Sequence, residues 1–155
     1  MGITNQAGLA EGAFAVRWIR HESNFAADPC INELIKADGW EAYGRYWRLV
    51  EMLCASLAHC VPKRDEQGFK RYALGLNLDE EGLEDYLGTL LELDLIETDE
   101  NGRYRSPLVD AHVRDMLRNR ENGRKGGLAA SKNRQQAQAA KGGAGDEQSG
   151  GVYRF

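Results

Sequence analysis

Residues 78–105 read LDEEGLEDYLGTLLELDLIETDENGRYR, and this stretch decides how the chain folds. Asp79 is a good helix N-cap, and Glu80 and Glu81 follow in the first turn, where carboxylates complement the positive end of the helix dipole. The stretch therefore predicts an amphipathic helix over residues 79–93. Its apolar face consists of leucines that recur at helical spacing, namely Leu83, Leu87, Leu90 and Leu91.

A β-hairpin is expected directly after that helix, over residues 95–105. Asn101-Gly102 is the strongest turn signal in the chain, because both central residues of a type I′ turn need positive φ. With a two-residue turn at this point, Thr98 faces Arg105 across the ladder. We therefore expect a hairpin with an acidic outgoing strand and a basic return strand.

Upstream of this stretch, the sequence predicts two helices separated at Gly39. Asp28-Pro29 supplies an N-cap and a first-turn proline, so the first helix begins there and stops at the glycine. The second helix, over residues 40–58, is the longest that we expect. Its apolar residues recur at steps of three and four and form one buried stripe, namely Tyr43, Trp47, Val50, Cys54 and Leu57.

Shorter elements flank these helices. Residues 14–20 alternate apolar and basic side chains near their end, which predicts a short half-buried strand. Residues 60–62 indicate a brief extended piece, and residues 69–76 a short helix. Ser106-Pro107 is the N-cap and first-turn proline of a last helix, which has an apolar face of its own.

Beyond residue 120 that apolar face ends. The remaining sequence is rich in Gly, Ala and Gln, and it cannot bury enough surface to offset the entropy of the chain. We therefore expect a loose N-terminus over residues 1–13, one folded domain over residues 14–120 and a disordered or weakly helical basic tail over residues 121–155.

The expected order of elements is strand, helix, long helix, extended piece, helix, helix, hairpin and helix. From residue 40 onward this order is typical of a winged helix, with residues 69–76 and 79–93 as its helix-turn-helix pair. We predict a mainly α (α+β) protein. It is a winged helix-turn-helix domain with a short N-terminal strand and a disordered basic C-terminal tail.

The composition is that of an ordinary globular protein. The chain has 155 residues, of which 42% are hydrophobic and 28% are charged, so one domain plus a tail is expected. The N-terminus lacks a signal-peptide pattern and no apolar run has the length of a membrane span, so we expect a cytoplasmic location and no membrane partner. Neither the three cysteines nor the three histidines have metal-site spacing, and a nucleophile elbow and a Walker loop are absent. The sequence thus predicts neither an enzyme nor a cofactor or metal.

The net charge of −4 hides a strong segregation of charge along the chain. Residues 79–102 carry ten acidic side chains and no basic one, whereas residues 103–134 carry nine basic and three acidic side chains. A helix that reads the major groove needs donors such as Arg, Lys, Asn or Gln. The acidic helix therefore favours a solvated face over a base-reading surface.

Residues 18–53, WIRHESNFAADPCINELIKADGWEAYGRYWRLVEML, resemble the N-terminal domain of phage and prophage replication initiators, also called replisome organisers. That domain is similar in opening with a His-Asp and Asp-Pro-x-Ile passage, followed by a long helix rich in Gly, Tyr and Trp. The likeness extends over about residues 14–127 and ends in a basic Gly-Gly motif at 124–127. The residues that match the opening and the long helix are His21, Asp28, Pro29, Ile31, Gly39, Tyr43, Gly44, Tyr46, Trp47, Leu49, Glu51 and Leu53.

The resemblance implies a winged-helix domain that recognises a phage replication origin and helps to assemble the helicase loader. Double-stranded DNA is then the expected partner, and the replicative helicase or its loader is a second one. Family members of this kind usually continue into a second domain, so we expect a short form of the initiator. The sequence predicts no oligomeric state.

Because the acidic helix repels phosphate, DNA contacts are expected from basic residues elsewhere. These contacts are phosphate and minor-groove interactions, which position a protein more than they specify a base. The expected residues lie on the short helix, the return strand and the tail, and they are Lys70, Arg71, Arg103, Tyr104, Arg105, Arg118, Arg120, Arg124, Lys125, Lys132 and Arg134.

Two other functions fit the same sequence. One is a protein-interaction module whose acidic surface over residues 79–100 docks a basic partner. The other is a small winged-helix transcriptional regulator, which would need a dimer and a symmetric operator. For the interaction module, the surface residues are Glu81, Glu84, Asp85 and Glu92.

Overall fold

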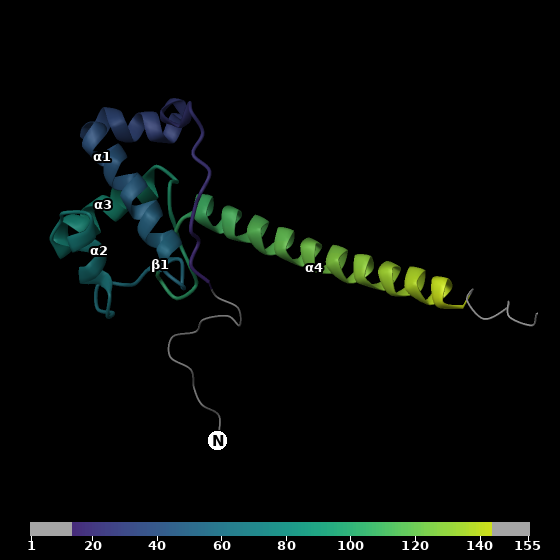
Figure 1. The fold of residues 1–155 in the computed structure, drawn as a ribbon. Helices are drawn as coiled ribbons and strands as arrows, with labels where there is room; N and C mark the ends of the chain where they lie inside the picture. Colours follow the sequence, from purple (N-terminus) through teal and green to yellow (C-terminus); the bar gives the residue numbers. More distant parts are fainter. Residues whose placement is uncertain (1–13, 144–155) are drawn as a thin grey trace, which may run out of the picture. The chain divides into compact units, whose positions relative to one another are not determined.

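The computed structural model describes residues 14–143, so the predicted loose N-terminus and the last part of the tail lie outside the described residues. The described chain is mainly helical with one small antiparallel sheet (Figure 1). It divides into two units, Met1–Arg114 and Asp115–Phe155. In chain order the elements are η1 (Phe25–Ala27), α1 (Pro29–Ala55), β1 (Cys60–Val61), α2 (Phe69–Gly75), α3 (Glu80–Glu92), β2 (Glu97–Thr98), β3 (Tyr104–Arg105) and α4 (Pro107–Gly142).

Helix α1 begins where the sequence predicts and is broken at Gly39. The Asp28 carboxylate caps it by accepting hydrogen bonds from the backbone N–H groups of Cys30 and Ile31, at 2.9 and 3.2 Å. Gly39 has φ +76° and ψ −176°, a backbone conformation that residues with a Cβ rarely adopt. The predicted separation of two helices at this glycine is therefore confirmed. The second part ends at Ala55, three residues before the predicted end.

Replacing Gly39 with alanine is expected to destabilise the fold by about 1–3 kcal/mol, because the break forces the new Cβ into a strained backbone conformation. Gly44→Ala is the matched control. Gly44 lies within the helical part of α1, and a Cβ there meets nothing within 4 Å, so this change should stabilise by roughly 0.5–1 kcal/mol. Urea unfolding of both variants measures the difference, and equal effects at the two glycines would contradict the strain at Gly39.

The predicted N-terminal strand is wrong. Residues 14–20 form an extended segment that bends at Arg17 and joins no sheet. Val16 N–H of this segment donates a hydrogen bond to the Cys54 carbonyl, at 2.7 Å. That carbonyl lies in the last turn of α1, where helix carbonyls lack an intrahelical partner. The segment therefore supplies a hydrogen-bond donor to the C-terminal end of α1. Its alternating sequence pattern arises because Val16 is buried between exposed neighbours.

The core of the first unit lies between α2, α3 and both parts of α1 (Figure 1). Helices α2 and α3 confirm the two helices predicted before the hairpin, and the Asp79 carboxylate caps α3 through Gly82 N–H at 2.7 Å. Of the predicted stripe on α1, Val50 and Cys54 are buried, but Leu57 is 48% exposed because the helix has already ended. The largest fully buried side chains include Tyr46, Phe69, Ile31, Leu34, Leu49, Leu53, Leu83, Leu87 and Leu90.

Two tyrosines of this core, Tyr46 and Tyr86, have buried side chains that end in a polar hydroxyl group. The Tyr86 hydroxyl of α3 donates to the Ala42 carbonyl of α1 at 2.8 Å, which ties the two helices together. Burial raises the pKa of Tyr86, and it raises the pKa of Tyr46 to about 12. Both hydroxyls therefore stay protonated at neutral pH.

The sheet has the order β1-β3-β2, and its hairpin has a different register from the predicted one. Thr98 pairs with Tyr104, not with Arg105. The Asp99 carboxylate accepts hydrogen bonds from two loop N–H groups, at 2.8 and 2.9 Å, and Gly102 alone in the loop has positive φ, at +76°. The loop therefore has three residues and ends in a glycine bulge, and the predicted two-residue type I′ turn is wrong.

Of the two expectations for the tail, the disordered one is wrong over residues 121–142, where α4 continues as a helix, and the helical one agrees with the structure. Ser106 caps the start of α4 as expected, with its hydroxyl 3.4 Å from Val109 N–H. Residues 128–141 are rich in Ala, Gln, Arg and Lys, which are strong helix formers, so local propensity favours a helix there without a core. The glycines in the turns just before them, Gly123, Gly126 and Gly127, are poor helix formers. Within the described residues, no helix is long and apolar enough to span a membrane.

Candidate nucleic-acid interface

The cations predicted to bind DNA lie on three elements and differ sharply in what they contact. Two are on α2, Arg105 is on β3 with Arg103 directly before that strand, and six are on α4. A cation that is already paired inside the protein must give up that partner to bind phosphate, whereas an unpaired exposed cation need not. The ion pairs of each element therefore decide which cations are available.

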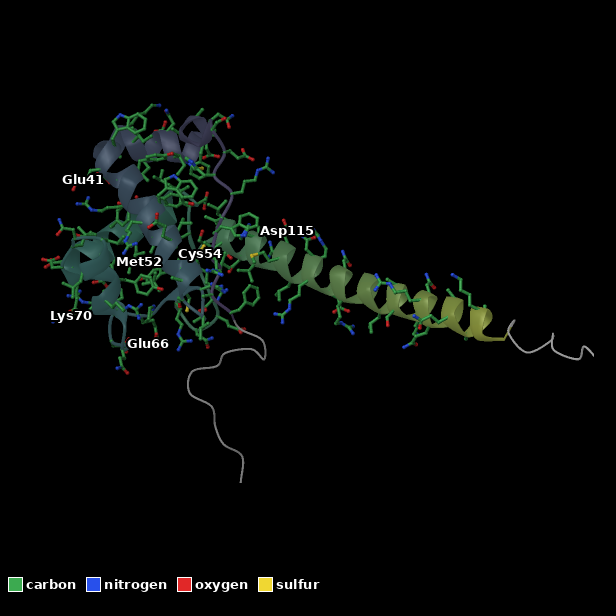
Figure 2. The ribbon with its side chains drawn as sticks, in the orientation of Figure 1. Glu41, Met52, Cys54, Glu66, Lys70 and Asp115 are labelled. Atoms are coloured by element: carbon green, nitrogen blue, oxygen red, sulfur yellow. The ribbon has the colours of Figure 1, made fainter. Side chains whose placement is uncertain are left out.

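Arg103, directly before the return strand β3, is held by Glu66. Glu66 lies in the loop before α2 (Figure 2). Its Nε and Nη2 atoms both donate to the Glu66 carboxylate, each at 3.1 Å, in a bidentate pair. Glu66 also accepts from Lys63 N–H at 2.9 Å. Hydrogen bonding to Arg103, with a smaller contribution from Lys63 N–H, lowers the pKa of Glu66 below its usual value. This pair fastens the hairpin to the loop before α2.

The lowered pKa of Glu66 predicts a pH dependence of stability. A carboxyl whose pKa is lower in the folded state stabilises the fold fully above its unfolded value, near 4.5, and this stabilisation is lost as the pH falls through the folded value. We expect Glu66→Gln to be less stable than the wild type at neutral pH, and the difference to shrink at successive steps below 4.5. Urea unfolding at each pH measures the difference.

Glu51→Gln provides a control for that experiment. Glu51 pairs with Arg48 at 3.0 Å on the surface, with both side chains more than half exposed. Pairs of this kind contribute little, so this change should alter stability little at neutral pH. A difference between Glu66→Gln and wild type that stayed constant through the acid range would count against the Arg103 pairing.

The Arg105 guanidinium also has hydrogen-bond partners within the domain. Its Nε and Nη2 atoms donate to Asp110 of α4 at 3.0 and 2.7 Å, and its Nη1 donates to the Ala58 carbonyl at 3.3 Å. Hydrogen bonding to Asp110 raises the pKa of Arg105. Tyr104 is half-buried between its two partner strands. The return strand therefore joins β1, the α2 loop and the start of α4, and its arginines have intramolecular partners.

Lys70 and Arg71 on α2 are exposed, and neither has an ion-pair partner among the residues that the structure describes. Figure 2 labels Lys70 on this helix. Arg71 lines a hollow of about 890 Å³ between the end of α1, β1 and α2. Met52 and Tyr72 contribute apolar surface to this hollow, and Arg103 lies at its edge. The structure therefore brings Arg71 and Arg103 together around one concavity.

Helix α4 carries the largest group of predicted cations. Three of them form surface ion pairs within the helix: Arg118 with Asp115 at 2.8 Å, and Arg124 and Lys125 with Glu121 at 2.8 and 3.7 Å. The other three are exposed and, over residues 14–143, have no ion-pair partner; they are Arg120, Lys132 and Arg134.

Sequence reasoning missed Lys141, which is exposed on the same helix. It lies seven residues after Arg134, so the two share a face once the segment is helical. The assumption of a disordered tail hid that signal.

The acidic residues of the alternative surface lie on α3. Glu84 pairs with Arg64, so part of its charge is neutralised within the domain. Glu81, Asp85 and Glu92 are exposed, and in the described part of the chain none has an ion-pair partner. Their spacing of four and seven residues places all three on one face of the helix.

The match to a family model covers the region from the N-terminal segment to the hairpin. The model described as Lin1244/Lin1753-like, N-terminal, matches residues 18–106, which is more than half of the chain. The chain belongs to this family. The Lin1244/Lin1753-like domain thus includes α1, the sheet, α2 and α3, and its match ends one residue before α4 begins. Comparisons with curated proteins and with solved structures gave no match.

Proposed function

We propose that the Lin1244/Lin1753-like domain of this chain is a winged helix and that the protein binds double-stranded DNA during phage or prophage replication initiation. The order of elements supports the fold: a long helix is followed by β1, two short helices and the β2–β3 hairpin. The pairing of β1 with β3 supports it further, because it attaches the hairpin to the helices as a wing. In this assignment α2 and α3 are the helix-turn-helix pair.

The main support for DNA binding is the positive charge of α4. Residues 115–142 contain seven basic and two acidic side chains, and nearly all of them are exposed. Lysine and arginine side chains that neutralise phosphates release counterions from the duplex, which supplies most of the non-specific affinity. Arg120, Lys132 and Arg134 can do so without breaking an ion pair.

The arrangement of these cations suits a helix that lies in a DNA groove, between the two sugar-phosphate backbones. Arg118, Lys125 and Lys132 recur every seven residues along one side of α4. Arg120 and Arg134 lie on the other side, since two residues correspond to roughly 200° of helix rotation. A helix in the major groove has one backbone on each side, so a row of cations on each side matches that geometry.

The replication role rests on the resemblance of residues 18–53 to replication initiators. The residues that carry it are held together: His21 Nε2 lies 3.2 Å from the Tyr43 hydroxyl, and the His21 ring meets the Trp47 ring edge-on at 4.2 Å. In this role the chain binds origin DNA in the cytoplasm, and the replicative helicase or its loader is the expected protein partner. It has no enzymatic activity of its own.

The test is the affinity of the full chain for duplex DNA across a salt titration. We expect binding at low salt, and a plot of log K against log salt with a slope near −0.9 for each phosphate neutralised. A slope of about −3 or steeper fits α4 as a phosphate anchor. Absence of duplex binding at low salt would refute the proposal.

A second function is favoured by one observation, the single acidic face of α3. Glu81, Asp85 and Glu92 are unpaired there, and they suit a protein partner with a basic surface. Replacing both Glu81 and Asp85 with lysine, which reverses their charge, distinguishes the two functions. The DNA proposal expects duplex affinity to be kept or increased, whereas an interaction module would lose its partner and show no duplex affinity before or after the change.

A further inference from the structure

Trp18 is a large aromatic side chain on the surface of the first unit. It is 65% exposed, although it belongs to the extended segment that packs along the domain. One edge meets the His112 ring of α4, with ring centroids 5.1 Å apart and an interplanar angle of 74°. The contact is edge-to-face, so the two rings are not stacked on each other.

Two hydrogen bonds, one between backbone groups and one from a histidine ring to a backbone carbonyl, fix the backbone that carries this side chain. Val16 N–H donates to the Cys54 carbonyl at 2.7 Å, and His112 Nε2 donates to the Trp18 carbonyl at 2.9 Å. The segment is therefore fastened on both sides of its bend at Arg17. An exposed ring held in this way loses little conformational freedom when it binds a ligand.

The charge beside Trp18 is positive. Arg17 and Arg20 are exposed, and within residues 14–143 neither has an ion-pair partner. The nearest acidic residue along the chain is Glu22, four positions after Trp18, so the two arginines outnumber it. The site thus combines an exposed ring with two available guanidinium groups.

Trp40 provides the internal comparison. It is 66% exposed, almost the same as Trp18, and it also meets an aromatic ring edge-on, that of Tyr43 at 5.6 Å. Its neighbours along the chain are Asp38 and Glu41, so its surroundings are acidic. The two tryptophans therefore differ mainly in the sign of the charge near them.

We infer that Trp18, with Arg17 and Arg20, forms a binding site for single-stranded DNA, in which an unpaired base stacks on the indole ring and the arginines contact the adjacent phosphates. Aromatic rings beside cations are the usual means of binding single strands without sequence preference. A base within a duplex is already stacked on both sides, so this site distinguishes single strands from duplex. The inference goes beyond the proposed duplex binding and uses none of the residues assigned to it.

The test is binding of a short fluorescent oligothymidylate to the full chain, followed by polarisation at low salt. Trp18→Ala is expected to weaken binding between about 5- and 150-fold, the range for removal of one stacking ring. Trp18→Phe should retain most of the affinity, and Trp40→Ala should retain all of it. Replacing Arg17 and Arg20 together with glutamine should flatten the slope of log K against log salt by roughly 1.4.

Duplex binding by the same variants separates this inference from the proposed function. We expect Trp18→Ala to bind duplex DNA as the wild type does, since no base in a duplex is free to stack. A wild-type protein that binds oligothymidylate but no duplex DNA would contradict the proposed function and leave this site standing. Equal oligothymidylate affinity of wild type and Trp18→Ala would overturn the inference, and so would equal losses with Trp18→Ala and Trp40→Ala. Circular dichroism of each variant identifies any loss that comes from unfolding, and Trp18→Phe then decides the outcome.

Discussion

Replacing Arg120, Lys132 and Arg134 with glutamine is expected to reduce the slope of log K against log salt for duplex DNA by about 2.7, or 0.9 for each charge removed. Between 50 and 200 mM salt, this reduces the loss of affinity by a factor of about 40. The physical reason is that these exposed cations have no ion-pair partner in the described chain, so each is free to neutralise a phosphate. A salt titration of the full-length variant beside wild type measures the change.

Arg105→Gln is the matched comparison for that variant. This change removes a hydrogen-bonded partner of Asp110 and a donor to the Ala58 carbonyl. It should therefore lower the free energy of unfolding and leave the salt slope unchanged. The α4 variant should show the reverse, with an altered slope and unchanged stability. A large change in slope with Arg105→Gln would mean that the hairpin contacts DNA directly, as the sequence alone suggested.

Replacing Phe69 with alanine is expected to cost about 3–5 kcal/mol of unfolding free energy. Phe69 begins α2 and is 1% exposed, among the largest fully buried side chains. Its removal leaves a cavity between helices that pack against one another, and the neighbouring side chains can fill such a cavity only in part. The loss is a large fraction of the 5–15 kcal/mol typical of whole domains. Urea unfolding with far-ultraviolet circular dichroism measures it.

Leu74→Ala is the control for the same helix. Leu74 is 69% exposed, so the substitution removes surface that already contacts water and should change stability by less than about 0.5 kcal/mol. The pair of variants tests whether α2 is oriented as described. Similar losses from both changes would place Leu74 in the core and contradict this orientation.

Elements whose signals are local could be predicted from the sequence. Helix α3 runs over Glu80–Glu92 inside the predicted residues 79–93, because its cap and its leucine face both lie within the segment itself. The break at Gly39 was predictable for the same reason, since a glycine between two helical patterns marks a backbone that needs positive φ. In both cases the information lies within one or two turns of the chain.

The candidate site could be predicted only as a list of residue types. The sequence identified Arg103 and Arg105 as basic residues of a hairpin but gave no means of finding Glu66, which lies 37 positions before Arg103. It predicted a disordered or weakly helical tail over residues 121–142 because they lack large apolar residues, and it gave no weight to the strong helix formers of residues 128–141. It also took Trp18 and its neighbours as part of a strand, which concealed an exposed ring beside two arginines.

By itself, the sequence determined where helices begin and stop, which faces are apolar and how charge is divided between the acidic helix and the basic C-terminal third. Those properties depend on neighbours a few residues apart, through capping, periodicity and turn geometry. Only the tertiary structure decided which cations are available. Arg103 and Arg105 are paired with carboxylates, whereas Arg17 and Arg120 have no such partner among residues 14–143. An ion pair depends on distance in space, and the fold alone brings distant residues within reach.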